Sequence, residues 1–485
     1  MANIAIVGGG VAGLSTGIYA QMNGHRATVY ERHSRAGGNL TGWDRGGYHI
    51  DNCIHWLTGT NPLTSLYKMW KDLGALGDVA LHRAETLYTF KKDGRQISLH
   101  RRIERVQEDM LRISPEDKRE IFSFIRAVKA LMRLNGIAGQ ENTEKSTLLQ
   151  KVFAVPALLK YYNLTTGELA ARFRHPLLQG FIKSFMTDGF SALALIMVFA
   201  TFSSGNGDIP VGSSCAMAER MTARFLALGG TLRLRAGVAK INTAAGKAQS
   251  VTLEDGTVEE ADYVVVATDP AVAFGKLLDK GLMPGPLAQQ YADPKMRRFS
   301  SHHCAFGCDS ADLPFQSDVL LEIPEKYKKE LCANYLMVRE FSHEKGFAPE
   351  GKNLLQTMIY CLEGDARSFI ELHRDTEAYK ARKKRMAAAI EEIVTDAFPV
   401  LRGKLQCIDV WTPATYQRYV DSEIGSFMSF IFPSGSLPRR LAASIDGLDN
   451  VFLATQWQQA PGGLPIAAGA GMDAVKAIMK KEKAV

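Results

Sequence analysis

The sequence predicts an α/β fold in which a parallel-sheet domain is interleaved with a second, α+β domain. Three observations predict it. A glycine-rich turn follows an apolar run at the N-terminus, a near-continuous apolar run covers residues 261–268, and a second strand–glycine–helix pattern lies near the C-terminus. Long apolar runs of this kind are typical of strands buried in a parallel sheet. Because the three segments lie far apart, the residues between them are left to build the second domain.

The N-terminal turn has the pattern of a dinucleotide-binding fingerprint. A buried strand at 4–7 is followed by the glycines Gly8, Gly10 and Gly13, a helix, and a second strand at 27–30 that ends in Glu31. The glycines permit a tight turn, close approach of a pyrophosphate and tight helix packing, while the helix N-terminus favours an anion. The predicted contacts in this turn are Gly8, Gly10, Val11, Ala12 and Gly13, in a Rossmann-like domain.

Two hairpins are predicted after this unit. The loop after Glu31 contains Gly37-Gly38, which again allows the backbone to approach a ligand, and residues 46–51 read as the edge of a hairpin. A further hairpin, 87–90 with 96–99, turns at Asp93-Gly94, a strong hairpin signal.

The middle of the first half is predicted to be helical. Ser114-Pro115 has the pattern of a helix start, with Ser114 as the capping residue and proline at the first helical position. Helical patterning continues to about residue 203. The apolar run 190–202 is too short to span a membrane and is predicted to be a buried helix. We expect this block to form a cap over a ligand site.

From about residue 210 the chain is predicted to return to the parallel sheet. A helix ends at Gly229-Gly230, strands follow at 231–234 and from Val238, two strands turn at Asp255-Gly256, and the buried run ends at Thr268. Strand-like runs between 297 and 364 and a long helix, 376–397, are assigned to the second domain. The predicted domains are 1–84, 205–290 and 405–485, which bind the dinucleotide, and 85–204 with 291–404, a mixed sheet with a helical cap.

The C-terminal pattern is a second strand–glycine–helix anion site. A strand at 451–455 leads to Gly463, Leu464 and Pro465, then to a helix rich in small residues through Ala477. Proline at a helix start loses no needed donor, and glycine lets the backbone reach a flat ligand. A flavin ring placed here would face the positive end of the helix dipole, which favours the reduced form by a few tenths to about 2 kcal/mol.

The chain resembles the phytoene desaturase, carotenoid isomerase and retinol saturase branch of the flavin-dependent amine oxidase-like superfamily. The matching segments are 8–15, Glu31, Arg35 with Gly37-Gly38, 47–51, Val238 with Ile241, and 261–268. The segment 412–419, followed by Gly425-Ser426, is especially typical of this branch. Ile466 and Ser213 depart from the family pattern, since glycine is usual at both positions.

The resemblance implies FAD, held non-covalently. It places Gly8, Gly10 and Gly13 at the pyrophosphate, Glu31 on the adenosine ribose, Val238 beside adenine, and Gly463 to Pro465 near the isoalloxazine. Further contacts are expected from Arg32, Gly37, Gly38, Asn39 and Thr268. A second G-x-G-x-x-G is missing, which disfavours a pyridine-nucleotide disulfide reductase. NAD(P)H as a reductant is left open, with no domain of its own.

The leading hypothesis is an oxidoreductase that saturates or desaturates carbon–carbon double bonds of a long apolar substrate, such as an isoprenoid or polyene. Amine or amino-acid oxidation and redox-neutral polyene isomerisation are the alternatives. A non-catalytic binder resembling the regulators of prenylated GTPases is disfavoured by the intact glycine turn. The direction of the reaction and the identity of the substrate stay open.

Three residues are candidates for catalysis. His55 lies where retinol saturases have a histidine and an aromatic residue, and it either shuttles a proton or is a hydrogen-bonded structural histidine, the latter being favoured. Tyr416 either lines a substrate channel or packs. For Arg418, a structural ion pair is favoured over a place in the channel.

Composition excludes several partners. Of the 485 residues, 46% are hydrophobic and 22% charged, and the formal charge of +7 is mild for this size. The basic clusters at 91–92, 101–102 and 382–385 lack the interleaved aromatics of a nucleic-acid surface. Solvated helix faces explain these clusters, with contact to an anionic membrane surface as the alternative. Seven scattered cysteines predict neither a disulfide framework nor a metal site. We expect a cytoplasmic protein, at the membrane surface in the alternative, of open oligomeric state.

Overall fold

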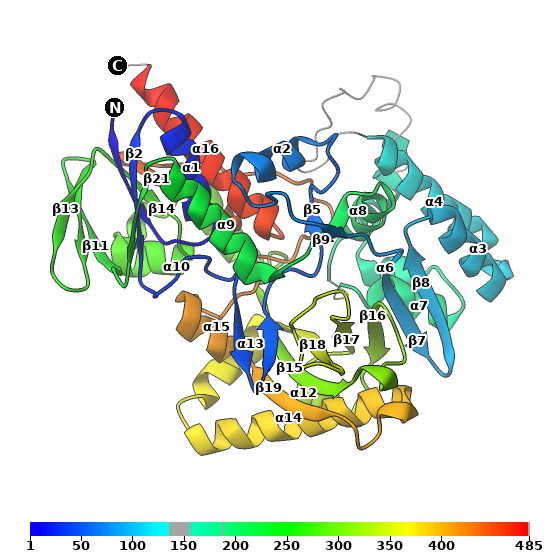
Figure 1. Ribbon diagram of the computed structural model, residues 1–485. Helices are drawn as coiled ribbons and strands as arrows, with labels where there is room; N and C mark the ends of the chain where they lie inside the picture. The colour runs from blue at the N-terminus through cyan, green and yellow to red at the C-terminus, as the bar shows by residue number, and fades with distance from the viewer. Residues whose placement is uncertain (135–154, 157, 187–188, 484–485) are drawn as a thin grey trace.

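The computed structural model describes residues 1–134, 155–156, 158–186 and 189–483. Figure 1 shows two sheets, one above the other, with a group of helices beside them. Both chain ends lie at the same side of the upper sheet (Figure 1). The predicted α/β class is confirmed. The predicted domain boundaries stay a prediction.

The upper sheet has six strands in the order β10 (Thr231–Leu234), β2 (Arg26–Glu31), β1 (Asn3–Val7), β14 (Tyr263–Val266), β21 (Leu448–Leu453) and β20 (Ser444–Ile445). The first five run parallel, and β20 pairs antiparallel with β21. Val7 of β1 stands opposite Tyr30 and Val266, so these strands end level with one another. In such sheets, ligands bind beyond the carboxyl ends of the strands.

Both faces of this sheet are covered. Val265 packs in the core that includes α1 (Val11–Met22), α2 (Ser65–Asp72), α9 (Ser213–Ala227) and α16 (Leu464–Glu482), whereas Val264 and Val266 face the other core. That second core includes α10 (Pro270–Val272), α11 (Gly285–Ala292) and the antiparallel strands β11 (Val238–Ala244) and β12 (Lys247–Leu253), the latter of which also pairs with β13 (Val258–Glu260). A Cβ at Gly471 would lie 2.5 Å from the Ala12 carbonyl oxygen, so α1 and α16 touch backbone to backbone.

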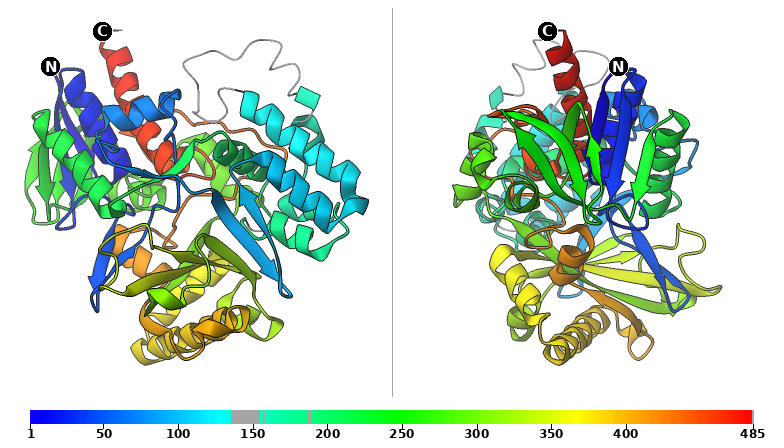
Figure 2. Two further views of the ribbon diagram at one scale, coloured as in Figure 1. Left: turned by 45° about the vertical axis from the view of Figure 1, so that its right-hand side comes forward. Right: turned by 90° about the vertical axis from the view of Figure 1, so that its left-hand side faces the viewer.

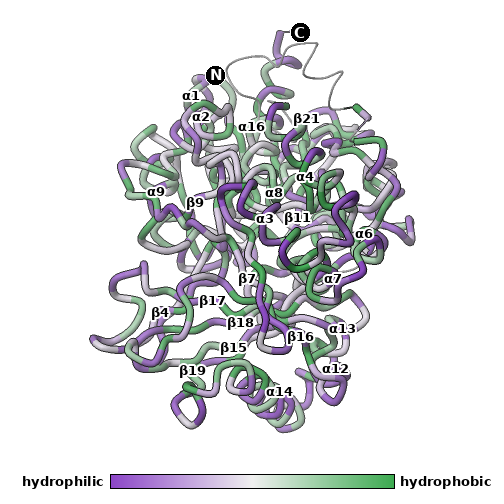
Figure 3. The backbone as a smooth tube through the Cα atoms, turned by 90° about the vertical axis from the view of Figure 1, so that its right-hand side faces the viewer, coloured by the Kyte–Doolittle hydropathy of each residue, from purple (hydrophilic) through white to green (hydrophobic). Residues whose placement is uncertain are grey.

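The lower sheet has seven strands in the order β19 (Gln406–Trp411), β15 (Phe299–Asp309), β18 (Lys352–Leu362), β17 (Tyr335–Glu340), β16 (Asp318–Glu322), β7 (Thr86–Lys92) and β8 (Arg95–His100). All neighbours are antiparallel except β16 and β7. One face packs on α12 (Glu325–Leu331), α13 (Glu363–Leu372) and α14 (Thr376–Ala397), at the bottom of Figure 2. Hydrophobic segments, green in Figure 3, run along the strands of this sheet.

A helical cap covers the other face of the lower sheet. It comprises α3 (Ile103–Ile113), α4 (Lys118–Arg133), α6 (Thr166–Ala170), α7 (Pro176–Lys183) and α8 (Ala192–Ser203). Edge-to-face contacts of Phe199 with Phe124 and Phe181 join these helices, and Leu320, Met337 and Met358 extend the same core into the sheet. The predicted buried helix over 190–202 is α8.

The predicted helix start at Ser114 needs a correction. A short 3₁₀ turn, Pro115–Asp117, comes first, and α4 begins at Lys118. Ser114 Oγ donates to Asp117 Oδ2 at 2.7 Å instead of capping a backbone amide. The reason is tertiary: Asp117 Oδ2 also accepts from the Arg174 amide at 2.8 Å and so is tied to the rest of the cap.

Short strands connect the two sheets. The predicted hairpin edge is β3 (Gly42–Arg45) with β4 (Tyr48–Asp51), and its tip reaches the lower sheet, where Tyr48 packs on Gly307 and the His49 amide donates to the Phe347 carbonyl at 2.9 Å. β9 (Gly207–Pro210) pairs with β5 (Leu57–Thr58) and β6 (Leu81–His82). Among the described residues, none of the helices combines the length and apolar character that crossing a bilayer requires.

Candidate cofactor and substrate site

A cavity of about 500 Å³ lies at the carboxyl ends of β1, β2, β14 and β21 and extends to α8 and the lower sheet. Its size is typical of small-molecule sites. Nearly all residues predicted to contact a cofactor line it: Gly8, Gly10, Val11, Ala12, Glu31, Arg32, Gly37, Gly38, Asn39, Val238, Thr268, Gly463, Leu464 and Pro465. The structure therefore brings together residues from both ends of the chain.

Gly13 is the exception, because it does not line the cavity but lies behind the turn, against Gly8. A Cβ at Gly13 would lie 1.9 Å from the Gly8 carbonyl oxygen, so only glycine lets α1 start directly against the end of β1. Gly10 is the N-cap residue of α1 and has no side chain with which to bond the first amides of the helix. Those amides are therefore free to bind an anion.

Glu31 is held in place by two backbone amides. Its Oε2 accepts from the Gly9 amide at 2.7 Å and its Oε1 accepts from the His33 amide at 2.9 Å. The side chain is buried at the end of β2 and lines the cavity. A carboxylate fixed in this way can still accept further hydrogen bonds, because two oxygens offer about four acceptor sites. Its role on a ribose stays a prediction.

The second glycine loop touches the first. The Gly37 amide donates to the Gly9 carbonyl at 2.8 Å, and a Cβ at Gly38 would lie 3.2 Å from the Gly10 Cα. Asn39 extends the loop and donates through Nδ2 to the Ser426 carbonyl at 3.3 Å. Bare backbone from two loops therefore forms one wall, which suits the close approach of a pyrophosphate.

The C-terminal turn forms the opposite wall. Gly463 has φ of +95°, a conformation that favours glycine, and Pro465 occupies the first turn of α16. The Gly463 amide donates to Gln456 Oε1 at 2.9 Å, which fixes the turn. Ile466, one of the departures from the family pattern, also lines the cavity. The glycine turns and the amides of α1 and α16 thus fit a dinucleotide cofactor.

The rest of the cavity wall is apolar. The residues contributed there by α8 and its approach, by β17 and β18 and by the segment 427–432 include no charged side chain among those the structure describes. They are Phe185, Met186, Phe190, Ala194, Met197, Val198, Thr201, Met337, Tyr360, Phe427, Met428 and Phe432. We call this part of the cavity the apolar chamber. Charged side chains line only the end near the glycine turns, where Glu31, Arg32, Arg35, Glu254, Asp269 and Asp421 lie.

His55 lines the cavity, and its ring lies 5.8 Å from that of Phe427. Burial, reinforced by the positive charge of Arg339 and by His303, holds the pKa of His55 well below its usual range. No described residue hydrogen-bonds the imidazole. His55 is therefore not the hydrogen-bonded structural histidine that the sequence favoured, because the peptide after β4 turns its ring toward the cavity.

Tyr416 and Arg418 lie outside the cavity wall. Both belong to α15 (Pro413–Val420), on which positions two apart point in nearly opposite directions. Tyr416 is buried and its hydroxyl lies 3.0 Å from His303 Nε2 and accepts from Trp411 Nε1 at 3.3 Å. Arg418 is exposed and forms no ion pair with a described residue, so the expected structural ion pair is also absent there. Their neighbour Tyr419 lines the cavity instead.

Replacing Arg418 by alanine is therefore expected to change little. An exposed side chain without a partner contributes within about 0.5 kcal/mol of stability. Thermal unfolding and flavin content of Arg418→Ala, measured beside the wild type, check this. A loss of flavin in this variant would show that Arg418 takes part in the cofactor site.

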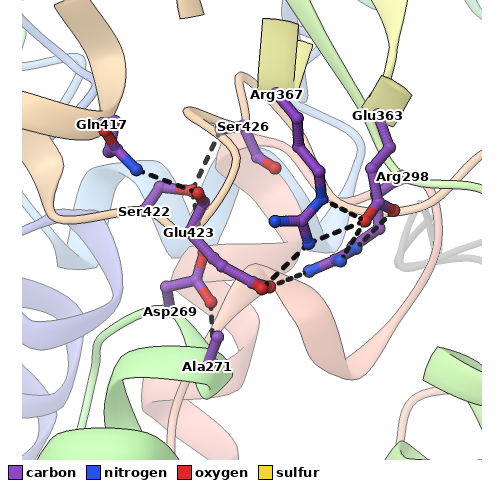
Figure 4. Close-up of polar contacts among 9 residues, drawn as sticks. All are labelled: Asp269, Ala271, Arg298, Glu363, Arg367, Gln417, Ser422, Glu423 and Ser426. Atoms are coloured by element: carbon purple, nitrogen blue, oxygen red, sulfur yellow. Dashed lines mark hydrogen bonds and ion pairs between the residues drawn. The ribbon is translucent and has the colours of Figure 1, made fainter. Parts of the chain in front are cut away.

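A loop at the other side of the cavity was not predicted from the sequence. Asp421, Ser422 and Ser426 line the cavity, and the three consecutive side chains of residues 421–423 are each anchored to a different element. Asp421 pairs with Arg32 at 3.3 Å and Lys276 at 2.8 Å. Ser422 Oγ donates to Asp269 Oδ2 at 2.8 Å and accepts from the Ser426 amide at 3.0 Å (Figure 4).

Glu423 belongs to a closed ring of four charges, which we call the Arg298 ring (Figure 4). Arg298 donates to both oxygens of Glu363, at 2.9 and 2.5 Å, and to Glu423. Arg367 closes the ring by donating to Glu363 at 3.0 Å and to Glu423 at 2.9 Å. The ring joins the start of β15 and α13 to the loop that lines the cavity.

The described residues hold no cluster of three or more histidine, cysteine or carboxylate side chains that could bind a metal. The site is thus built from backbone amides, one fixed carboxylate and an apolar chamber. Such a combination fits a dinucleotide cofactor beside an apolar chamber.

The chain belongs to the flavin containing amine oxidoreductase family, whose model matches residues 11–479. Its resemblance to the phytoene desaturase branch is confirmed by its relatives. The chain is 26% identical over 298 residues to a neurosporene-forming phytoene desaturase of Rhodobacter capsulatus, a match that covers 57% of this chain and 54% of that protein. It thus spans about half the length of that relative.

A longer match links the chain to the lycopene-forming phytoene desaturase of a Paracoccus species. The two are 25% identical over 447 residues, which cover 87% of this chain and 86% of that protein. Among solved structures, an oxidoreductase from Methanosarcina mazei is similar, with a TM-score of 0.63 and 16% identity over 98% of this chain and all of that one. Putrescine oxidase bound to putrescine follows at a TM-score of 0.60 and 14% identity, each chain being covered to 99%. These structures share the fold.

Proposed function

We propose that this protein adds or removes hydrogen at a carbon–carbon double bond of a long apolar substrate, such as an isoprenoid or polyene. The observation that carries the proposal is the apolar chamber, to which the described residues contribute no charged side chain. An ammonium or carboxylate substrate brought there would lose its hydration without gaining a partner, at a cost of several kcal/mol. The named carotenoid desaturases among its relatives support the same substrate class.

The proposed cofactor is FAD, bound without a covalent bond. The turns at 8–13 and 37–39 and the fixed Glu31 would hold its adenosine and pyrophosphate, and the turn at 463–465 would face its ring. FAD supplies hydride transfer when it is bound. The chain's own residues bind and orient the reactants and exclude water, and the first turn of α16 stabilises negative charge near the ring.

Anaerobic titration of the flavin-loaded protein with candidate polyenes, in its reduced and in its oxidised form, tests this function. If the protein saturates double bonds, an unsaturated apolar compound should restore the absorbance of the reduced flavin and yield a product two mass units heavier. If it desaturates, the compound should bleach the oxidised flavin and yield a product two mass units lighter. A product of unchanged mass would indicate isomerisation. Neither change with any of the polyenes, together with bleaching of the oxidised protein by putrescine or another amine, would overturn the proposal in favour of an amine oxidase.

A further inference from the structure

Several side chains that line the cavity have a polar atom without a hydrogen-bond partner among the described residues, such as Asn39 Oδ1 and Ser426 Oγ. Tyr360 and His55 are two further cases. Tyr360 on β18 and His55 after β4 both line the cavity. Tyr360 makes one ring contact, an edge contact with Phe299 at 5.7 Å, and its hydroxyl bonds to none of the described residues. The His55 ring lies 5.8 Å from that of Phe427, and no described residue hydrogen-bonds its imidazole. By contrast, the buried hydroxyl of Tyr88 donates to the Phe181 carbonyl at 3.0 Å, whereas that of Tyr291, outside the cavity wall, also lacks a partner in the described part of the chain.

Arg339 fixes the peptide that carries His55. This buried residue of β17 donates to Asp318 Oδ2 at 3.3 Å and to the carbonyls of Ile54 and His55 at 3.1 and 3.4 Å. The peptide that carries His55 is thus tied to the sheet that carries Tyr360. Arg339 itself does not line the cavity, because its guanidinium is occupied with these three oxygens.

Both groups are neutral near pH 7. Burial raises the pKa of Tyr360 to about 12, against the smaller opposing effect of Arg339, so the hydroxyl remains a donor. The lowered pKa of His55 keeps the imidazole uncharged, with one nitrogen that donates and one that accepts. A neutral donor and a neutral donor–acceptor can each hydrogen-bond an uncharged oxygen. Neither neutralises the charge of an ammonium or a carboxylate.

An unpaired hydroxyl in an apolar wall is costly. A buried polar group without a partner costs about 1–3 kcal/mol, so a native site retains one where a ligand or water completes it. A site built around such a group also discriminates strongly against ligands that lack the matching atom. Phenylalanine would fill the same wall without this cost.

We propose that Tyr360 and His55 are a polar pair that serves an uncharged oxygen: Tyr360 donates a hydrogen bond to a hydroxyl or carbonyl oxygen of the substrate, and the substrate is therefore an oxygen-bearing apolar molecule rather than a plain hydrocarbon. This assignment rests on the proposed function, because it assumes an apolar substrate in the chamber. His55 is the second neutral polar group of the same cavity.

Equilibrium binding to the flavin-loaded protein tests the pair without requiring turnover. The probes are a C20 conjugated polyene alcohol and the hydrocarbon of the same carbon skeleton, and the readout is the perturbation of the flavin absorbance. Wild type should bind the alcohol about tenfold more tightly, the ratio expected for one net hydrogen bond. Tyr360→Phe should bring the ratio to about one and leave flavin content and hydrocarbon affinity unchanged.

Tyr327→Phe serves as the matched control, since Tyr327 is on α12 with its hydroxyl near the surface, bonded to Glu392. It should keep the wild-type ratio. Equal affinities for the two probes in wild type would show that Tyr360 and His55 hold only water, and would overturn the pair while the proposed function stands. If neither probe perturbs the flavin, the proposed function fails and the pair fails with it.

Discussion

Gly13→Ala is expected to yield a protein that retains no flavin and whose free energy of unfolding is about 3 kcal/mol lower than that of wild type, the upper range for an overpacked site. The added Cβ would lie 1.9 Å from the Gly8 carbonyl oxygen and 3.4 Å from Ile6. No rotamer relieves a clash between a Cβ and a backbone atom. The start of α1 must therefore move away from β1, and the amides that face the cavity move with it.

Gly285→Ala is the control for the same change of residue. Gly285 opens α11, has no positive φ, and a Cβ there meets no atom within 4 Å. Its variant should keep full flavin content and wild-type stability, measured by the absorbance ratio of the purified protein and by urea unfolding. Retention of flavin by Gly13→Ala would show that the glycine turn is not the anchor of the cofactor.

The glycine turns were predictable because their roles are local. Gly8, Gly10 and Gly13 act within one strand, turn and helix, and the backbone conformation they require limits the residue type. The same holds for Gly463 to Pro465. The α/β class followed from the same local patterns together with the apolar run at 261–268, and the structure confirms it.

Which side chain of a helix faces a site was not predictable. The segment 412–419 was correctly identified as typical of the family branch. Tyr416 and Arg418 were predicted from it as site residues, but the structure places Tyr419 in the cavity wall instead. Packing decides which face of α15 points to the cavity, since Tyr416 contacts His303 on β15, a strand more than a hundred residues earlier. No sequence pattern marks Tyr360 either, because its significance is the lack of a partner.

The Arg298 ring left no signal in the sequence at all. Its two glutamates lie 65 and 125 positions from Arg298, and isolated arginines and glutamates are usually solvated surface residues. Only the fold brings them to one point, beside a loop whose cavity-lining residues were not predicted. Long-range polar networks of this kind form only where the tertiary structure brings distant residues together, whereas a glycine turn is made by residues that are neighbours in the sequence.

Arg298→Met should lower stability by about 2–4 kcal/mol and weaken flavin binding. The Arg298 side chain is only 10% exposed, and its removal leaves Glu363 and Glu423 facing each other without their main partner. Breaking a buried pair costs about 3–5 kcal/mol, and we reduce this because the two carboxylates are about one-third exposed. Flavin binding weakens because Glu423 follows Ser422 and Asp421, which line the cavity.

Arg367→Met is the matched control from the same ring. Arg367 is 48% exposed, so water can replace its hydrogen bonds, and the expected loss is at most about 1 kcal/mol with unchanged flavin affinity. Urea unfolding and a fluorescence titration of FAD into the apoprotein measure both quantities. Equal losses in the two variants would show that the ring acts as general surface charge and does not hold the loop.

The effect of Arg298→Met should also depend on pH, with a defined sign. Burial raises the pKa of Glu363 and Glu423, but hydrogen bonds from the two arginines outweigh it and lower each pKa below its usual range. A lowered pKa in the folded state adds stability above the unfolded value of about 4.3, and that stability is lost as the pH falls through the folded value. The stability difference between wild type and Arg298→Met is therefore largest near pH 7 and shrinks below about pH 4.3. A difference that stays constant down to pH 3 would assign the loss to the packing of Arg298 on Tyr291, 5.0 Å away, and not to the ring.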